Sequence, residues 1–441
     1  EASMVTMPAP RAERPLALTV YGATGFTGRL AAEYVQTQYG TTNLAWAIAG
    51  RSRAKLEALK AELAGPDAAY PSIVVADGDD AGALDVLAAQ TKAVATCAGP
   101  FSRYGSKLVA ACAARGTDYC DITGETDWVR AMITEHDDTA RASGARLVHC
   151  CGHDSVPWDL CALKLTQALR AQGDAELRSL EFFDEIDGRP SGGTLETAFG
   201  IILGKDSTSF SKSLGYDPLL KTPPPSSEAS SAKSKFALKA RNVLVVDRTG
   251  ADLAGSVGQH RSETTLAART FFVMAGVNAN VVKRSNALLG YGASVSYREG
   301  LACASSLRAL ASFSGLAVLG LLLALPPTRF LLRRFALPKP GEGPTRDQMD
   351  KGYLHVTGVA TGASGKTAAC RMSFYRDAGY LDTARMVVEA ALTLSLSAPA
   401  DFDGARAPAG GSHTPASCQG SALLKRLCDT GSTFEMLPAG P

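Results

Sequence analysis

Three glycines at intervals of three residues form the strongest chemical motif of the chain: Gly22, Gly25 and Gly28. They follow a short apolar run, 16–21, and lead into a helix-forming sequence. This order of strand, glycine turn and helix is typical of a site for a dinucleotide diphosphate, which binds at the helix N-terminus. An ordinary tight turn is the alternative, because GxxGxxG departs from the commoner GxGxxG. The expected cofactor contacts in this motif are Gly22, Thr24, Gly25, Phe26, Thr27 and Gly28.

The second predicted strand, 44–49, is followed by the basic residue Arg51 and by Ser52. In a doubly wound sheet this strand end meets the adenosine ribose. A carboxylate there would bind the ribose hydroxyls of NAD, whereas a guanidinium suits the 2′-phosphate of NADP. We therefore expect NADP(H), held by Arg51 and Ser52, with Arg53 or Lys55 as a further cation. The alternative is that these are solvated charges at the start of the next helix.

Two later strand ends would complete the cofactor site. Asp77 follows a third apolar strand, 72–76, and a turn of small residues follows a fourth, 92–96. Because the carboxyl ends of parallel strands share one edge, we expect that turn to face the nicotinamide half of the cofactor. A plain Gly-Pro turn is the alternative. The residues concerned are Ala98, Gly99 and Pro100.

Strands and helices alternate through the first 150 residues, which predicts βαβ units and a parallel sheet. The fold class that we expect is α/β, a Rossmann-type doubly wound sheet. The length of 441 residues predicts a second domain. The remaining strands of the first domain are expected at 117–121 and 145–149, and its later helices at 79–90, 106–115 and 126–143.

The sequence does not single out a proton donor. The Tyr-x-x-x-Lys pair of short-chain reductases is absent, because Tyr104 and Lys107 have the wrong spacing. A histidine has a pKa range that suits proton transfer, although a histidine in a turn is more often a structural hydrogen-bonding group. The two acidic groups nearest the fifth strand could instead cap the helix that follows. The catalytic candidates are Asp121, Glu125, His153 and Asp154.

Composition limits the class of protein. The net charge of +2 argues against a nucleic-acid partner. The 10 cysteines have no regular spacing and the 6 histidines are scattered, so we expect no metal site and reduced, buried thiols in an intracellular protein. We expect a location in the cytoplasm, or at the surface of a membrane or lipid droplet. The sequence does not identify an organelle.

The chain resembles the saccharopine dehydrogenase-like oxidoreductases, a group that includes the vertebrate saccharopine dehydrogenase-like protein and the mycobacterial trans-acting enoyl reductases. The similarity extends from about residue 16 to 396, and His153 departs from it, because relatives usually carry Phe or Tyr there. The motifs that carry it, in order, are GATGFTG, AGR, CAGPF, DYCDITGE, GHDSVPWDL, SGGT, VVKRSN, LPKPGEGPTRDQMDKGY and AGYLDTARMVVEAAL.

The resemblance implies an NADP-type Rossmann domain with a second α+β domain inserted before a returning helix. It does not imply saccharopine chemistry. It implies an NADP(H)-dependent reductase of an enoyl or keto group on a hydrophobic, lipid-linked substrate. The alternative is a non-catalytic scaffold that binds the cofactor at a lipid droplet, at a membrane or as a subunit of a homodimer or larger assembly. The expected parts are a disordered start 1–14, a Rossmann domain 15–175, a second domain 176–377, a returning helix 378–397 and a tail 398–441.

The second domain is less clear from sequence. A helix cap is the alternative to a substrate contact at Gly192, Gly193 and Thr194. We expect a mobile loop at 205–240 and strands or extended segments at 180–186, 269–274, 277–282, 352–362 and 367–375.

The most apolar run, 312–325, is shorter than the roughly 20 residues of a membrane crossing, so we do not predict a transmembrane helix. Together with the basic stretch that follows, it forms the segment 312–335. Three interpretations remain open: a buried core helix, a contact with a lipid surface, or the wall of an acyl pocket.

Overall fold

The computed structural model describes residues 10–65, 68–153, 155–188, 219, 268–303, 305–335, 343–403 and 407–438. The chain divides into two compact units, each built from two stretches of sequence. The first unit contains residues 1–153 and 383–426, and the second contains residues 154–382 and 427–441. The expected loop 205–240 and the residues 192–194 lie outside the described residues, apart from residue 219.

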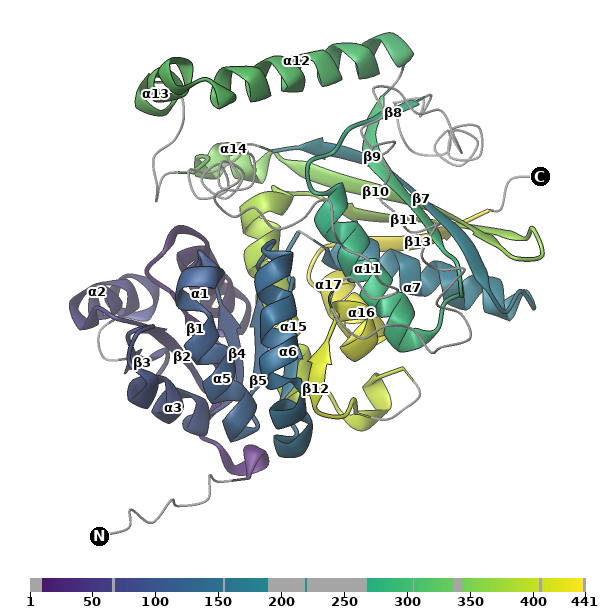
Figure 1. Cartoon of the computed structure of the whole chain (residues 1–441). Coiled ribbons are helices and arrows are strands. Elements are labelled where there is room, and N and C mark those ends of the chain that lie inside the picture. Colours follow the sequence, from purple (N-terminus) through teal and green to yellow (C-terminus); the bar gives the residue numbers. More distant parts are fainter. Residues whose placement is uncertain are drawn as a thin grey trace. The chain divides into compact units, whose positions relative to one another are not determined.

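The first unit contains a seven-stranded sheet with the order β12-β6-β5-β4-β1-β2-β3, in which every pair of neighbours is parallel (Figure 1). The central strands are buried from end to end, which explains their continuous apolar runs. This sheet and its helices confirm the predicted fold class. The strands are β1 (Leu16–Tyr21), β2 (Trp46–Gly50), β3 (Ser72–Val75), β4 (Thr91–Thr96), β5 (Asp118–Asp121), β6 (Arg146–Val148) and β12 (Gly411–His413).

Helices follow the strands as the alternating pattern predicts. Asp80 caps α3 by accepting hydrogen bonds from the N–H groups of Gly82 and Ala83, both at 3.0 Å. The late helix α15 (Thr383–Leu396) packs against α1, β1, β4 and β5, and most of its side chains are buried. The other helices are α1 (Phe26–Tyr39), α2 (Arg53–Ala64), α3 (Ala81–Gln90), α4 (Phe101–Tyr104), α5 (Ser106–Arg115), α6 (Thr126–Ser143), α16 (Pro415–Cys418) and α17 (Gly420–Asp429).

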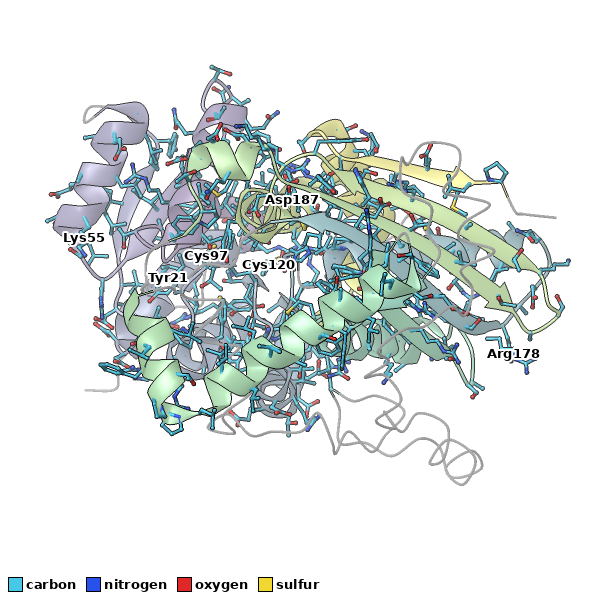
Figure 2. The ribbon with its side chains drawn as sticks, turned by 90° about the horizontal axis from the view of Figure 1, so that it is seen from above. Tyr21, Lys55, Cys97, Cys120, Arg178 and Asp187 are labelled. Carbon is cyan, nitrogen blue, oxygen red and sulfur yellow. The ribbon has the colours of Figure 1, made fainter. Side chains whose placement is uncertain are left out.

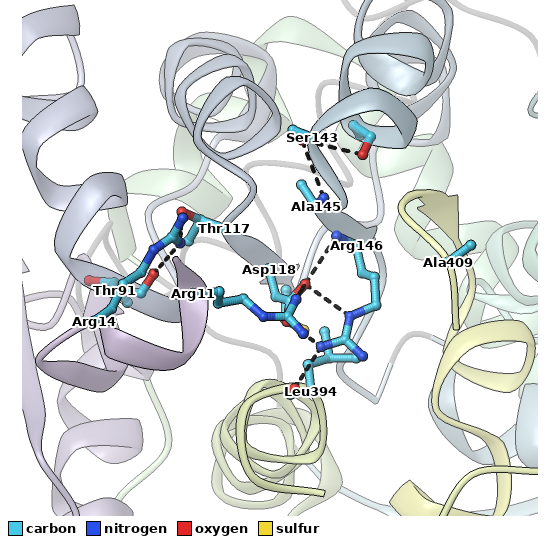
Figure 3. A network of polar contacts seen from close by, with 12 residues as sticks. Arg11, Arg14, Thr91, Thr117, Asp118, Ser143, Ala145, Arg146, Leu394 and Ala409 are labelled. Atoms are coloured by element: carbon cyan, nitrogen blue, oxygen red, sulfur yellow. Dashed lines mark hydrogen bonds and ion pairs between the residues drawn. The ribbon is translucent and has the colours of Figure 1, made fainter. Parts of the chain in front are cut away.

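A buried ion-pair network connects the start of the chain to the sheet (Figure 3). The carboxylate of Asp118 accepts two hydrogen bonds of 2.8 Å from Arg11 and is also paired with Arg146. Arg146 in turn donates to the carbonyl of Leu394 in α15. The network therefore joins three distant parts of the sequence within the first unit.

The second unit contains a six-stranded mixed sheet with the order β13-β11-β10-β7-β9-β8. Helices α7 (Val156–Ala171) and α11 (Ala275–Leu289) contact each other, and α7 packs on β10 and β11. The strands are β7 (Leu177–Asp187), β8 (Ala268–Thr270), β9 (Ser296–Cys303), β10 (Tyr353–Gly362), β11 (Thr367–Phe374) and β13 (Thr433–Leu437).

Two consecutive helices of the second unit leave most of their apolar side chains exposed: α12 (Ser306–Ala324) and α13 (Pro326–Phe335). We call them the apolar arm. In Figure 1 the arm is the dark green pair, and α12 contacts β8 and β9. Only 12% of the apolar window Ser306–Leu323 is buried, so the interpretation as a buried core helix is wrong. Within the described residues, α12 is long and apolar enough to cross a membrane by length and composition alone.

Four expectations about the elements differ from the structure. The expected disordered start 1–14 is wrong for residues 10–14, because Arg14 is buried and donates hydrogen bonds to Thr117 and to the carbonyl of Thr91. The first unit ends at His153 and not at residue 175, because α7 packs on the second sheet. Residues 277–282 belong to α11, where burial against α7 and β9 outweighs the strand preference of their valines. The expected tail instead adds β12 to one sheet and β13 to the other. Both strands are too short to show a period in the sequence.

Candidate functional site

The glycine turn after β1 has the geometry that a diphosphate cradle needs. Gly22 has a φ of +77°, and a Cβ added there would lie 2.9 Å from the Cβ of Ala98. A Cβ added at Gly28 would lie 2.1 Å from the carbonyl oxygen of Gly22, so only glycine lets α1 approach the strand so closely. Both sites therefore exclude a side chain for steric reasons.

The N-terminus of α1 opens at this turn. The helix begins at Phe26, and Gly25 is its N-cap residue with no side-chain cap. Thr24 and Gly25 are exposed, and Phe26 and Thr27 are partly exposed, so the helix start is open with respect to the described residues. The first backbone N–H groups of a helix carry a partial positive charge and suit a phosphate. The residues present therefore fit the diphosphate of a dinucleotide.

The end of β2 presents a cation and a hydroxyl. Arg51 is exposed, and it makes no ion pair with any residue that the structure describes. Ser52 is the N-cap residue of α2, but its side chain makes no cap hydrogen bond. By contrast, Arg53 pairs with Glu57 at 3.7 Å on the same helix. Arg51 is thus a cation at the end of β2 whose charge is not offset by an ion pair within the described residues, and the same holds for Lys55 on α2.

The carboxyl ends of β1 and β4 lie side by side. The N–H of Cys97 donates to the carbonyl of Tyr21 at 3.0 Å, and Figure 2 shows both residues near the middle of the first unit. Burial, with Asp77 nearby, raises the pKa of Tyr21 to about 12, so its hydroxyl stays protonated. Burial and the charge of Asp121 raise the pKa of the Cys97 thiol to about 12. This thiol is therefore no nucleophile at neutral pH.

Four further predicted cofactor contacts lie in the loops that follow β3 and β4. The carboxylate of Asp77 accepts a hydrogen bond from the N–H of Asp79 at 3.0 Å and is exposed. Gly99 and Pro100 are exposed, and Ala98 is partly exposed, so the turn after β4 is open at this edge. Whether these residues contact the cofactor stays a prediction.

Glu125 has a role that the sequence did not suggest. Its carboxylate accepts hydrogen bonds from the N–H groups of Phe101 at 2.7 Å and Ser102 at 2.9 Å. It thereby caps α4, which follows the small-residue turn, and makes no side-chain cap on α6. The expectation that Glu125 caps the next helix is wrong, because the start of α4 lies within its reach. Glu125 holds the turn in place.

Asp121 also makes no cap on α6. It is fully buried, and its Oδ2 lies 2.7 Å from Nδ1 of His149. Its Oδ1 accepts from the N–H groups of Cys150 at 2.9 Å and Thr123 at 3.1 Å. Asp121 thus positions His149, which is itself buried. The expectation that Asp121 caps the helix after β5 is therefore wrong as well.

His149 was missed in the sequence, although a signal was present. It directly follows β6, and Asp121 ends β5. Neighbouring parallel strands end at the same edge of a sheet, so an acidic residue and a histidine in these two places must lie close together.

Of the remaining two catalytic candidates, the structure describes His153 but not Asp154. His153 is buried, and its backbone N–H donates a hydrogen bond of 3.0 Å to Oγ1 of Thr383, within the first unit. Asp154 lies outside the described residues, as do the substrate candidates 192–194. Among the residues with described positions, no group of three or more His, Cys, Asp or Glu side chains could hold a metal ion.

Known proteins are similar to this chain over most of its length. Residues 18–148 match the saccharopine dehydrogenase NADP-binding domain. A Mycobacterium tuberculosis protein named as a trans-acting enoyl reductase is 33% identical over 434 residues, which cover 96% of this chain and 97% of that protein. A trans-acting enoyl reductase of Mycobacterium ulcerans is 32% identical over 433 residues, covering 95% and 97%.

Solved structures also resemble the fold. The apo saccharopine dehydrogenase (L-Glu forming) from Saccharomyces cerevisiae aligns with 96% of this chain and 99% of its own chain. The TM-score is 0.47 and the sequence identity is 14%.

Proposed function

Because the chain belongs to the saccharopine dehydrogenase-like oxidoreductases and binds NADP(H), we propose that it reduces an enoyl or keto group on a hydrophobic, lipid-linked substrate. The observation that carries this proposal is the glycine turn, in which Gly22 and Gly28 allow close backbone packing and the N-terminus of α1 has no side-chain cap. Its relatives with the name enoyl reductase support the reaction class.

Residues of the first unit would hold the cofactor. The start of α1 would bind the diphosphate, and Arg51 with Ser52 would bind the 2′-phosphate. The exposed turn at Gly99 would leave room for the nicotinamide. NADPH supplies a hydride when bound, and the chain contributes binding, orientation and a proton. The capped helix α4 fixes the turn for this purpose.

The apolar arm supports a hydrophobic substrate at a lipid surface. Leu307, Val318, Leu321, Phe330 and Leu331 each expose more than half of their surface, from 54% to 76%. So many large exposed apolar side chains on one segment are uncommon on a protein that meets only water. The α13 sequence PPTRFLLRRF also holds three arginines, a composition that suits anionic headgroups. We propose that the arm contacts a membrane or lipid droplet, from which the substrate is drawn.

NADPH oxidation tests the reaction. We expect the purified chain to oxidise NADPH with 2-enoyl or 3-keto thioesters, and to prefer long acyl chains over four-carbon analogues. The assay should include liposomes, which present the long-chain substrates as a surface. Arg51→Ala is the matched control, because it weakens the cofactor site without touching the apolar arm. If NADPH binds but no member of the panel causes its oxidation, the non-catalytic scaffold becomes the better explanation.

A further inference from the structure

A continuous row of contacts leads from the glycine turn to a histidine along the carboxyl edge of the first sheet. Gly22 packs so closely on Ala98 that an added Cβ would lie 2.9 Å from it. Thr96, at the end of β4, is in register with Asp121 at the end of β5. Oδ2 of Asp121 then lies 2.7 Å from Nδ1 of His149, within hydrogen-bond distance. Adjacent strands are about 4.8 Å apart, so His149 lies roughly 10 Å across the sheet from the turn after β4.

The imidazole of His149 is held on one side and unsatisfied on the other. Its Nδ1 faces Asp121, whereas its buried Nε2 has no hydrogen-bond partner among the residues with described positions. The rings of Trp128 and Tyr119 flank it, each with a centroid distance of 5.5 Å. A buried polar nitrogen without a partner costs about 1–3 kcal/mol. The unpaired nitrogen lies at the carboxyl edge of the sheet, where ligands of such sheets bind.

The backbone beside the ring is strained in a way that fixes this arrangement. Cys150 has a φ of 61°, which is unfavourable for a residue with a side chain. This conformation directs its N–H to Oδ1 of Asp121, which also accepts from the N–H of Thr123. The carboxylate is therefore held by three donors, and the ring orientation follows from it. Strain of this kind is concentrated at functional sites.

We infer that His149, positioned by Asp121, holds the proton that accompanies hydride transfer and responds to the charge of the nicotinamide end of the cofactor. The inference rests on the proposed reductase function. In the reduction of a carbon–carbon or carbon–oxygen double bond, the substrate gains one hydride and one proton. The imidazolium supplies the proton, becomes neutral imidazole and takes a proton back from water, so that charge and atoms balance.

Four other ionisable groups lie around this pair. Burial raises the pKa of Tyr119 well above its usual value, and it also raises the pKa of the Cys151 thiol. Burial and Asp121 raise the pKa of Cys97 to about 12. On the facing helix α6, burial lowers the pKa of His136. His136 is therefore the group that an experiment must separate from His149.

Nitrogen NMR of histidine-labelled protein tests the inference without requiring turnover. At one fixed pH we expect the nitrogen chemical shifts of the His149 ring to differ between the NADP⁺ and NADPH complexes, because the oxidised ring carries a positive charge. The shifts of His136 should change much less. Equal His149 shifts in the two complexes would overturn the inference, and the wild-type protein suffices for this measurement.

Cofactor binding gives the reciprocal readout. The ratio of the Kd of NADP⁺ to the Kd of NADPH should fall about three- to tenfold between pH 6.0 and 8.5. The ratio cancels the titration of the 2′-phosphate, which both forms share. It should become flat in His149→Asn and remain pH-dependent in the control His136→Asn. A flat ratio in the wild type would contradict the inference even if substrates are reduced. If the ratio depends on pH through His149 but no substrate is reduced, only the proposed reaction is contradicted.

Discussion

Arg51 illustrates how a single side chain can define cofactor choice. It extends from the end of β2 and has no ion-pair partner in the described parts of the chain. A guanidinium whose charge is not offset can bind the 2′-phosphate through two parallel hydrogen bonds. NADH lacks that phosphate, so the same side chain contributes little to its binding.

We predict that Arg51→Ala weakens NADPH binding by about 10- to 100-fold, the equivalent of a hydrogen bond to a charged group. NADH binding should change by less than about twofold, since it lacks the phosphoryl group that Arg51 would meet. Fluorescence titration of both nucleotides measures the two effects. Arg53→Ala is the matched control, because Arg53 already pairs with Glu57. Equal losses for NADPH and NADH would exclude the 2′-phosphate assignment.

At the scale of elements, the Asp118 network joins the N-terminal segment, β5, β6 and α15 (Figure 3). The side chains of Asp118 and Arg146 are almost completely buried, with 0% and 2% exposed. The Arg11 side chain is 35% exposed and closes the pair from the surface. Removal of the acidic charge would leave two guanidinium groups facing each other without compensation.

We predict that Asp118→Asn lowers the free energy of unfolding of the first unit by about 3–5 kcal/mol, the usual cost of breaking a buried ion pair. Urea unfolding followed by circular dichroism measures this loss. Glu33→Gln is the control, since its pair with Arg29 is exposed and such pairs contribute about 0.3–0.5 kcal/mol. A loss no larger than that of the control would show that the network does not stabilise the unit.

At the scale of the whole molecule, the proposed lipid contact and the cofactor site belong to different units of the chain. The arm belongs to the second unit, whereas the glycine turn and Arg51 belong to the first. Each can therefore be altered by substitutions that leave the other unchanged. This separation allows membrane binding and nucleotide binding to be tested independently.

We predict that the double substitution Leu321→Glu and Phe330→Glu removes the protein from liposomes that contain anionic lipid. These two side chains are 62% and 67% exposed, so the charges should not disturb a core. Flotation in a density gradient measures the bound fraction. Val86→Glu is the control, because Val86 is 63% exposed but lies on α3, away from the arm in sequence. Unchanged flotation of the double variant would contradict lipid contact through the arm.

Short-range features of this protein could be predicted from the sequence. The turn at Gly22, the close packing at Gly28 and the alternation of strands with helices depend on residues within a few positions of one another. Steric limits on φ and the length of an apolar run act at that range. For the same reason β1 and the helices α5 and α6 have the predicted bounds.

Only the tertiary structure decided the features that join distant residues. β12 and β13 have three and five residues, and their pairing with β6 and β11 supplies the stability that their sequences do not indicate. The contact of His149 with Asp121 joins residues 28 positions apart, and the capping of α4 by Glu125 joins residues 23 and 24 positions apart. The exposure of the apolar arm likewise depends on what packs against it. Burial and hydrogen bonding across such separations are properties of the folded chain, and hydrophobicity alone does not specify them.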